Sequence, residues 1–201
     1  MNYQTIKESS VSEYRDRGSK FLGFLIPLIS NQEVRIELKN LRNANLSATH
    51  VCRAYRLYDS NSVNEKGSDD GEPSGSAGVP ILNELKRNNL VNVGMFVVRH
   101  YGGRKLGVSG LIHSYTETTR IAIFNNSLSD WELKKEYILN HNYHDMRNLD
   151  FLIKKYNAKL IGREFDLFIK SHFEIGDKLS NQFKLEIESK LSKSVSLVSV
   201  K

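Results

Sequence analysis

The chain contains two kinds of hydrophobic pattern, one typical of strands and one typical of helices. Short runs rich in aromatic and β-branched residues, clearest at residues 21–26, predict strands. Apolar residues three or four positions apart, such as Val34, Leu38 and Leu41, predict amphipathic helices. In the N-terminal part we predict strands over residues 3–7, 21–28, 50–58 and 91–101, a turn over 15–20, and helices over 32–46, 80–87 and 110–125.

Two segments of this part depart from the simple patterns. Residues 93–98 are almost continuously apolar, which predicts a strand in the centre of a sheet. Residues 59–79 are polar and rich in glycine, and we predict an irregular loop there. Irregular segments of this length inside a compact domain are uncommon and are often functional.

The C-terminal part has a different order of elements. Its pattern predicts a strand over residues 133–143, a helix over 145–156, strands over 159–165 and 167–175, a helix over 177–190 and a strand over 195–200. This βαββαβ order is the ferredoxin-like split arrangement, an antiparallel sheet with both helices on one face. We therefore predict an α+β protein with an N-terminal α/β domain at residues 1–126, a linker over 125–131 and a ferredoxin-like domain at 132–201.

The composition is that of a folded protein without disulfides. Of the 201 residues, 39% are hydrophobic and 26% are charged, which suits two compact domains and not a disordered chain. Cys52 is the only cysteine, so no intramolecular disulfide can form, and its place in an apolar strand predicts a buried thiol. The polar start lacks the pattern of a signal peptide, and no apolar run reaches the length of a membrane span. We expect a cytoplasmic protein.

The first candidate site is the segment 68–80, which combines three carboxylates with small residues and leads into a helix. The carboxylates would suit a divalent cation, although the spacing is not that of an EF-hand. Small residues before a helix would suit a phosphate group, and a third interpretation is a tight turn whose carboxylates cap backbone donors. The residues concerned are Asp69, Asp70, Gly71, Glu72, Pro73, Gly75, Ser76 and Gly78.

The second candidate site is the segment 99–110, in which cationic residues flank glycines between a strand and a helix. This arrangement suits contact with a phosphate backbone or an acidic partner, and the formal net charge of +6 favours such polyanions. The alternative is a solvated cationic loop whose glycines allow positive φ angles. The residues concerned are Arg99, His100, Gly102, Gly103, Arg104, Lys105, Gly107, Ser109 and Gly110.

Catalytic and metal sites find little support in the sequence. The six histidines show neither the H-E-x-x-H pattern nor Cys/His zinc spacing. Ser74 and Ser76 lack the G-x-S-x-G elbow, and neither glycine-rich segment has the spacing of a P-loop or a Rossmann fingerprint. We predict no catalytic residue, no metal and no cofactor.

Both glycine-rich segments resemble motifs of the IMPACT/YigZ family. The resemblance covers four segments in order, residues 19–21, 49–56, 69–82 and 99–111. Ser76 stands where the family often has threonine, and His113 stands where it often has arginine, which makes one cationic contact pH-dependent. The resemblance implies an N-terminal domain similar to one of a small-subunit ribosomal protein and to domain IV of elongation factor G. It also implies a C-terminal domain similar to domain V of that factor.

The resemblance further implies a role near the translation machinery. Eukaryotic members of the family restrain a translation-control kinase by competing for its ribosome-associated activator, and they carry an extra N-terminal RWD domain. This chain has no room for such a domain before residue 19, so it resembles the bacterial members, which have no settled activity.

From these features we expect a non-catalytic regulator of translation that binds RNA, the ribosome or a ribosome-associated factor through a basic, glycine-rich surface. Two alternatives stay open: a protein-interaction module without nucleic-acid binding, and an enzyme that binds a nucleotide or phosphate. The side chains that we expect to face a polyanion are those of His50, Arg53, Arg56, Arg99, His100, Arg104 and Lys105.

Overall fold

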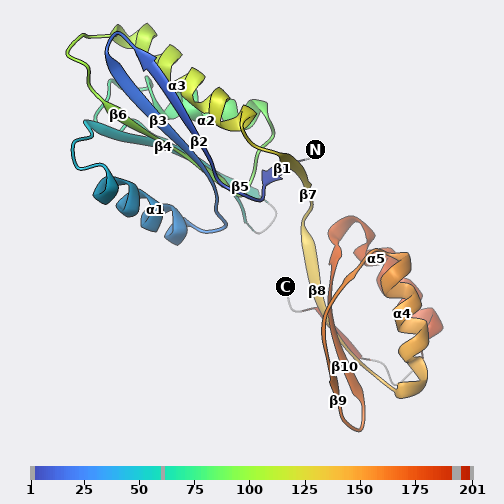
Figure 1. The fold of residues 1–201 in the computed structure, drawn as a ribbon. Coiled ribbons are helices and arrows are strands. Elements are labelled where there is room, and N and C mark those ends of the chain that lie inside the picture. The colour runs from blue at the N-terminus through green and yellow to red at the C-terminus, as the bar shows by residue number, and fades with distance from the viewer. Residues whose placement is uncertain (1–2, 60–61, 192–195, 200–201) are drawn as a thin grey trace. The chain divides into compact units, whose positions relative to one another are not determined.

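The computed structural model describes residues 3–59, 62–191 and 196–199 (Figure 1). The chain divides into two compact units, Met1–Trp131 and Glu132–Lys201. No helix in the described part of the chain combines the length and the apolar character needed to cross a bilayer.

The first unit is built on a five-stranded antiparallel sheet with the strand order β2-β3-β6-β4-β5. A separate two-stranded sheet pairs the first strand of the unit with its last, β1 with β7. The strands are β1 (Tyr3–Ile6), β2 (Ser10–Asp16), β3 (Ser19–Pro27), β4 (His50–Asp59), β5 (Ser62–Ser68), β6 (Val93–His100) and β7 (Leu128–Trp131).

Helices cover both faces of the five-stranded sheet (Figure 1). Helix α1 (Asn31–Ala44) packs on one face, where Val34 and Leu41 join Phe96 and Val98 in one core. Helices α2 (Gly78–Arg87) and α3 (Gly107–Phe124) cover the other face and form a second core with side chains such as Met95. Because β6 lies at the centre between the two cores, both of its faces are buried, which confirms the central strand predicted from its continuous apolar run.

Three local predictions for the first unit are wrong. Residues 10–16 form the edge strand β2, and the chain reverses at Arg17 and Gly18, so the turn predicted over 15–20 is narrower. Residues 62–68 form β5 within the predicted irregular loop. Residues 128–131 form β7 within the predicted linker. β2 and β5 are edge strands made mostly of polar residues, so neither shows the apolar run that marks a central strand.

The second unit follows the predicted βαββαβ order, with one additional 3₁₀ turn. Its antiparallel sheet has the strand order β11-β8-β10-β9, and Figure 1 shows both helices on the same side of it. A separate core joins sheet and helices, with Leu139, Leu149, Phe173 and Phe183 fully buried. The elements are β8 (Lys134–His141), η1 (Tyr143–Asp145), α4 (Met146–Lys155), β9 (Lys159–Phe165), β10 (Ile169–Gly176), α5 (Asp177–Lys190) and β11 (Ser196–Ser199).

Candidate functional site

The loop between β5 and α2 is closed by the side chain of Asp69. Its Oδ1 accepts hydrogen bonds from the backbone N–H groups of Ala77 at 2.9 Å and Gly78 at 2.8 Å, and its Oδ2 accepts one from Gly75 at 2.9 Å. Burial raises the pKa of the Asp69 carboxyl, but the three hydrogen bonds together outweigh it and hold that pKa below the ordinary value. The carboxylate therefore lies where helix α2 begins and occupies the place that an external anion would take.

The other two carboxylates of the loop point toward separate partners. Asp70 forms an ion pair with Arg42 and accepts a hydrogen bond from the N–H of Val51 at 2.8 Å. Glu72 turns inward and is 8% exposed. Because the carboxylates are engaged one by one with donors of the chain, the capped-turn interpretation describes this loop. The phosphate-cradle and divalent-cation interpretations do not describe it, because both need groups that donors of the chain already engage.

Glu72 is the centre of a buried polar network beneath the loop. Its Oε1 accepts hydrogen bonds from Nη1 of Arg99 at 2.6 Å and from the hydroxyl of Tyr115 at 2.8 Å. The Tyr115 hydroxyl also lies 3.2 Å from the thiol of Cys52, and the guanidinium group of Arg99 lies over the ring of Phe21. The network thus joins the loop to β3, β4, β6 and α3.

Burial also fixes the protonation of two members of this network. Burial is the main cause that raises the pKa of the Cys52 thiol, and it likewise raises the pKa of the Tyr115 hydroxyl. Both groups therefore stay neutral at neutral pH, so Tyr115 donates its proton to Glu72 and Cys52 is the buried thiol that its strand predicted.

The loop between β6 and α3 rests on the turn between β2 and β3. Gly102 lies so close to Gly18 that a Cβ atom on Gly102 would lie 1.9 Å from the carbonyl carbon of Gly18. The N–H of Gly102 donates a hydrogen bond to the hydroxyl of Ser19 at 3.2 Å. Helix α3 begins at Gly107 and so contains Ser109 and Gly110, three residues earlier than predicted. The two glycine-rich segments are therefore both anchored by contacts within the chain.

The predicted cationic surface is divided by the structure. Arg99 is 5% exposed and its charge is engaged by Glu72, so it does not face solvent. Arg56 is 8% exposed and its guanidinium group bonds Glu65 at 3.0 Å and the carbonyl oxygen of Leu90 at 2.8 Å. The expectation that these two arginines face a polyanion is therefore corrected, because carboxylates of the chain already take their charges.

The histidines of the predicted surface are half-buried. Nδ1 of His50 lies 2.8 Å from the carbonyl oxygen of Asp70, and its Nε2 lies 3.9 Å from Oε2 of Glu72. Nδ1 of His100 lies 3.5 Å from the hydroxyl of Ser47. His50 thus closes the loop from one side, and His100 lies beside the turn that follows α1.

Three members of the predicted surface form no ion pair with the described residues of the chain. Arg104 and Lys105 are exposed in the loop before α3, and no carboxylate lies within ion-pair distance of them in the described residues. Arg53 projects from β4 on the face covered by α1, opposite to Arg56, because an odd number of positions separates the two in a strand. Arg53 is therefore not part of the cationic loop that holds Arg104 and Lys105.

Sequence reasoning missed the cations that surround Arg53. Arg35 of α1 and Lys66 of β5 line a pocket together with it. Lys66 lies in the segment that was predicted to be an irregular loop, so no strand register was available to place it beside β4. Only Val63 is apolar among residues 62–66, so no alternation of apolar and polar residues marks this strand in the sequence.

The comparisons with known proteins identify the chain. The model of the Impact N-terminal domain matches residues 17–123, which is more than half of the chain and includes both glycine-rich segments. The protein belongs to the IMPACT family. The resemblance stated from the four motif segments is thereby confirmed.

Several IMPACT family proteins are similar over most of this chain. The IMPACT family member YvyE of Bacillus subtilis (strain 168) is 30% identical over 161 residues, which cover 77% of this chain and 74% of the relative. An IMPACT family member of Haemophilus influenzae is 29% identical over 194 residues, covering 94% and 93%. A crystal structure described as that of a hypothetical protein has a TM-score of 0.68 at 23% identity and covers 100% of this chain and 98% of that one, a likeness of fold.

Proposed function

We propose that this protein regulates translation by binding RNA, on the ribosome or beside it, through the cationic loop that holds Arg104 and Lys105. The observation that carries the proposal is the contrast between two groups of cations. Arg99 and Arg56 are neutralised inside the fold, whereas Arg104 and Lys105 are exposed and have no carboxylate within ion-pair distance in the described residues. Exposed, unpaired cations are the groups that contact phosphate backbones.

The anchoring of the loop supports the same proposal. Because Gly102 packs against Gly18 and bonds Ser19, the stem of the loop is fixed before any partner arrives. Arg17 lies next to Gly18 in the neighbouring turn and is also exposed. A fixed stem reduces the conformational entropy lost on binding, so the two loop cations are better phosphate ligands than they would be on a flexible segment.

The direct test is co-sedimentation with ribosomes and with a single-stranded RNA across a series of salt concentrations. The variant R104Q/K105Q should bind more weakly, and the slope of log affinity against log salt should fall by about 1.4, since each lost phosphate contact on a single strand contributes about 0.7. The matched control is K178Q/K184Q, which removes two exposed lysines of α5 and the same total charge. Equal losses in the two variants, or no salt dependence in the wild type, would refute the proposal.

A second candidate function is the docking of a protein partner, and one observation favours it. Tyr101, Val108 and Ile112 flank the cationic loop and are 47%, 53% and 40% exposed. Apolar side chains that stay exposed beside a rigid loop are typical of a protein contact. Partner capture that survives nuclease treatment and high salt, and that is lost in the variant V108S, would favour this function over RNA binding.

Two further proposals concern the fold type of each unit and the cellular location of the protein. We propose that the second unit is a ferredoxin-like domain similar to domain V of elongation factor G, supported by its βαββαβ order and its sheet order β11-β8-β10-β9. For the first unit we propose the type found in a small-subunit ribosomal protein and in domain IV of that factor, and for the protein a place in the cytoplasm.

A further inference from the structure

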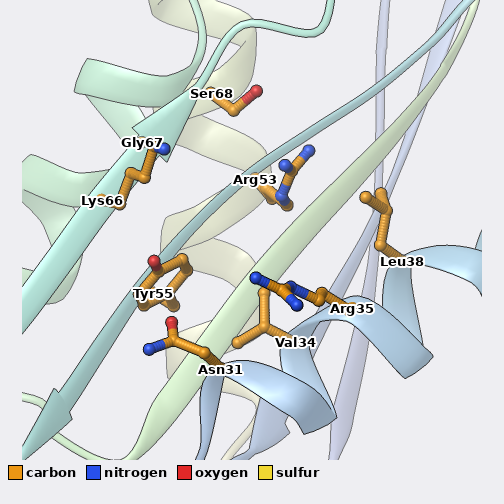
Figure 2. A pocket seen from close by; sticks show the side chains of 9 residues that line it. All are labelled: Asn31, Val34, Arg35, Leu38, Arg53, Tyr55, Lys66, Gly67 and Ser68. Carbon is orange, nitrogen blue, oxygen red and sulfur yellow. The ribbon is translucent and has the colours of Figure 1, made fainter.

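A small cationic pocket lies between α1 and the strands β4 and β5, on the face of the sheet opposite to the buried Glu72 network. Its volume is about 150 Å³. Figure 2 shows the guanidinium groups of Arg35 and Arg53 in the space between the helix and the two strands. The polar side chains that line the pocket are those of Asn31, Arg35, Arg53, Tyr55, Lys66 and Ser68.

The charges in this pocket are not balanced by the chain. Arg35, Arg53 and Lys66 have no carboxylate within ion-pair distance in the part of the chain that the structure describes, and the lining contains no acidic residue. The neighbouring cations on the other face of β4 and β5 behave differently, because Arg56 and Lys86 both pair with Glu65. Three like charges that line one pocket without a counter-charge repel one another, and a bound anion would relieve this repulsion.

We propose that this pocket binds the terminal phosphate group of a phosphate monoester. Two guanidinium forks and an ammonium group supply charge-assisted donors for a tetrahedral dianion, and the Tyr55 hydroxyl and the Asn31 amide supply neutral ones. The volume is well below that of pockets that enclose a drug-sized ligand, so it admits one charged group and not a whole nucleotide.

A monoester fits this pocket better than an internal phosphodiester. A terminal phosphate carries up to two charges and only one substituent, so it can enter a small pocket end-on and neutralise most of the excess charge. An internal diester carries one charge and has substituents on both sides, so it neutralises less of the excess charge and needs more room than a pocket of about 150 Å³ offers. A terminal phosphate monoester of this kind occurs in two molecules, a free mononucleotide and the 5′ end of an RNA strand.

This inference goes beyond the proposed function, because its residues belong to another face of the first unit than the cationic loop. Arg104 and Lys105 do not line the pocket, and Arg35 and Lys66 belong to α1 and β5. Loss of RNA binding in R104Q/K105Q therefore leaves the pocket intact, and loss of phosphate binding in a pocket variant leaves the loop intact.

The experiment is thermal denaturation of the full chain in phosphate-free buffer at constant ionic strength. The probes are inorganic phosphate, 5′-AMP, and a tetraribonucleotide with either a 5′-phosphate or a 5′-hydroxyl group. Inorganic phosphate and 5′-AMP should raise the Tm of the wild type, because ligands that bind the folded state stabilise it by mass action. The variants R53Q and K66Q should bind each phosphate probe at least tenfold more weakly.

The matched control is K39Q, which removes an exposed lysine from α1, one turn beyond Arg35 and outside the pocket. It should respond to phosphate like the wild type. Lys66 has an exposed side chain on the edge strand β5, whereas Arg53 lies on the interior strand β4. If R53Q disturbs the fold of the sheet, K66Q alone still tests phosphate binding. Without ligand, R53Q and K66Q should melt at or above the Tm of the wild type, since each relieves repulsion.

The oligonucleotides distinguish the sources of the phosphate. Binding of the 5′-phosphorylated tetranucleotide at the affinity of 5′-AMP supports an RNA end as ligand, and binding of 5′-AMP alone supports a small nucleotide. The oligonucleotides are measured in the R104Q/K105Q background, so that RNA binding by the cationic loop does not contribute. In that background, equal binding of the 5′-hydroxyl form overturns the proposal, because the pocket would then recognise internal diesters. The absence of any shift with all four probes, or a shift of the same size in K66Q, also overturns it.

Discussion

At the scale of single residues, the first unit contains a charged pair that is buried in its interior. Glu72 and Arg99 form a hydrogen-bonded ion pair in which both side chains are almost inaccessible to solvent. Such a pair adds little net stability relative to apolar residues, but the loss of one partner leaves the other as an uncompensated buried charge. The pair therefore fixes the position of the loop that carries Glu72, and Arg99 does not contact partners at the surface.

The substitution E72Q should destabilise the first unit by about 3 kcal/mol, because it leaves the buried guanidinium group of Arg99 without a counter-charge. The free energy of unfolding in urea measures this. The matched control is E117Q, whose carboxylate pairs with the half-exposed Arg120, and for which the loss should be about 1 kcal/mol or less. Equal losses in the two variants would contradict the role given to Glu72.

The carboxylate of Asp69 should give the stability of the first unit a dependence on acid pH. Its folded-state pKa lies below the ordinary value, so its stabilising contribution is fully present above the unfolded-state pKa of about 3.9. That contribution disappears as the pH falls through the folded-state pKa. The variant D69N should be less stable than the wild type at pH 6, by about 1–3 kcal/mol, and should lose less stability between pH 5 and pH 2.

Urea unfolding at several pH values tests this prediction. The variant D130N changes an exposed aspartate of β7, so its pH profile should follow that of the wild type. A wild-type profile that coincides with that of D69N below pH 5 would show that the three hydrogen bonds do not depend on the charge of Asp69.

At the scale of elements, the loops of the first unit are held by close backbone contacts. The stem of the cationic loop touches the β2–β3 turn at Gly102 and Gly18, two positions that are 84 residues apart in the sequence. A strand end and a turn can approach this closely only where no side chain intervenes. The geometry of the loop is thus set by the sheet.

The variant G102A should destabilise the first unit by about 3 kcal/mol, because its Cβ atom would overlap the backbone of Gly18. The neighbouring variant G103A is the control. Gly103 has a φ of +83° but open space around it, so alanine there should cost only about 1 kcal/mol through backbone strain. Thermal or urea unfolding separates the two effects, and a larger loss in G103A would contradict the close contact.

The central elements were predictable from sequence, and the edges were not. The apolar run of residues 93–98 predicted the central strand β6 because both faces of that strand are buried. β5 escaped prediction because an edge strand beside a glycine-rich loop needs few apolar residues. That omission also hid the pocket, since Lys66 takes its position from the pairing of β5 with β4.

For the candidate site, only the exposure and orientation of side chains that depend on their own loop or strand could be predicted from the sequence. The exposure of Arg104 and Lys105 follows from their place in a glycine-rich loop, and the opposite orientation of Arg53 and Arg56 follows from the alternation of a strand. The engagement of Arg99 by Glu72 has no local signal, because the two are 27 positions apart and meet only through the tertiary fold.

At the scale of the whole molecule, the two units share the excess of positive charge equally. Residues 1–131 carry 16 basic and 13 acidic side chains and residues 132–201 carry 13 and 10, so each unit has a formal net charge of +3. Bulk charge therefore does not distinguish the units. In the first unit, cations without an ion pair to the described residues lie next to one another in the loop before α3 and line the pocket beside α1.

The separate cores of the two units should give two unfolding transitions. The variant F173A removes a fully buried ring that packs edge-on against Phe183, and it should destabilise the second unit by about 3–5 kcal/mol. Differential scanning calorimetry should show that F173A lowers one transition and E72Q the other. A single transition that moves as a whole in both variants would contradict independent unfolding.

The position of Asp69 at the start of α2 determines whether the loop needs a ligand in order to fold. Because the Asp69 carboxylate already accepts three backbone hydrogen bonds, we expect the loop to be ordered without a bound nucleotide, metal or partner. The amide protons of Gly75, Ala77 and Gly78 should therefore exchange slowly with deuterium in the purified protein, and adding ATP and Mg²⁺ should leave their exchange rates unchanged.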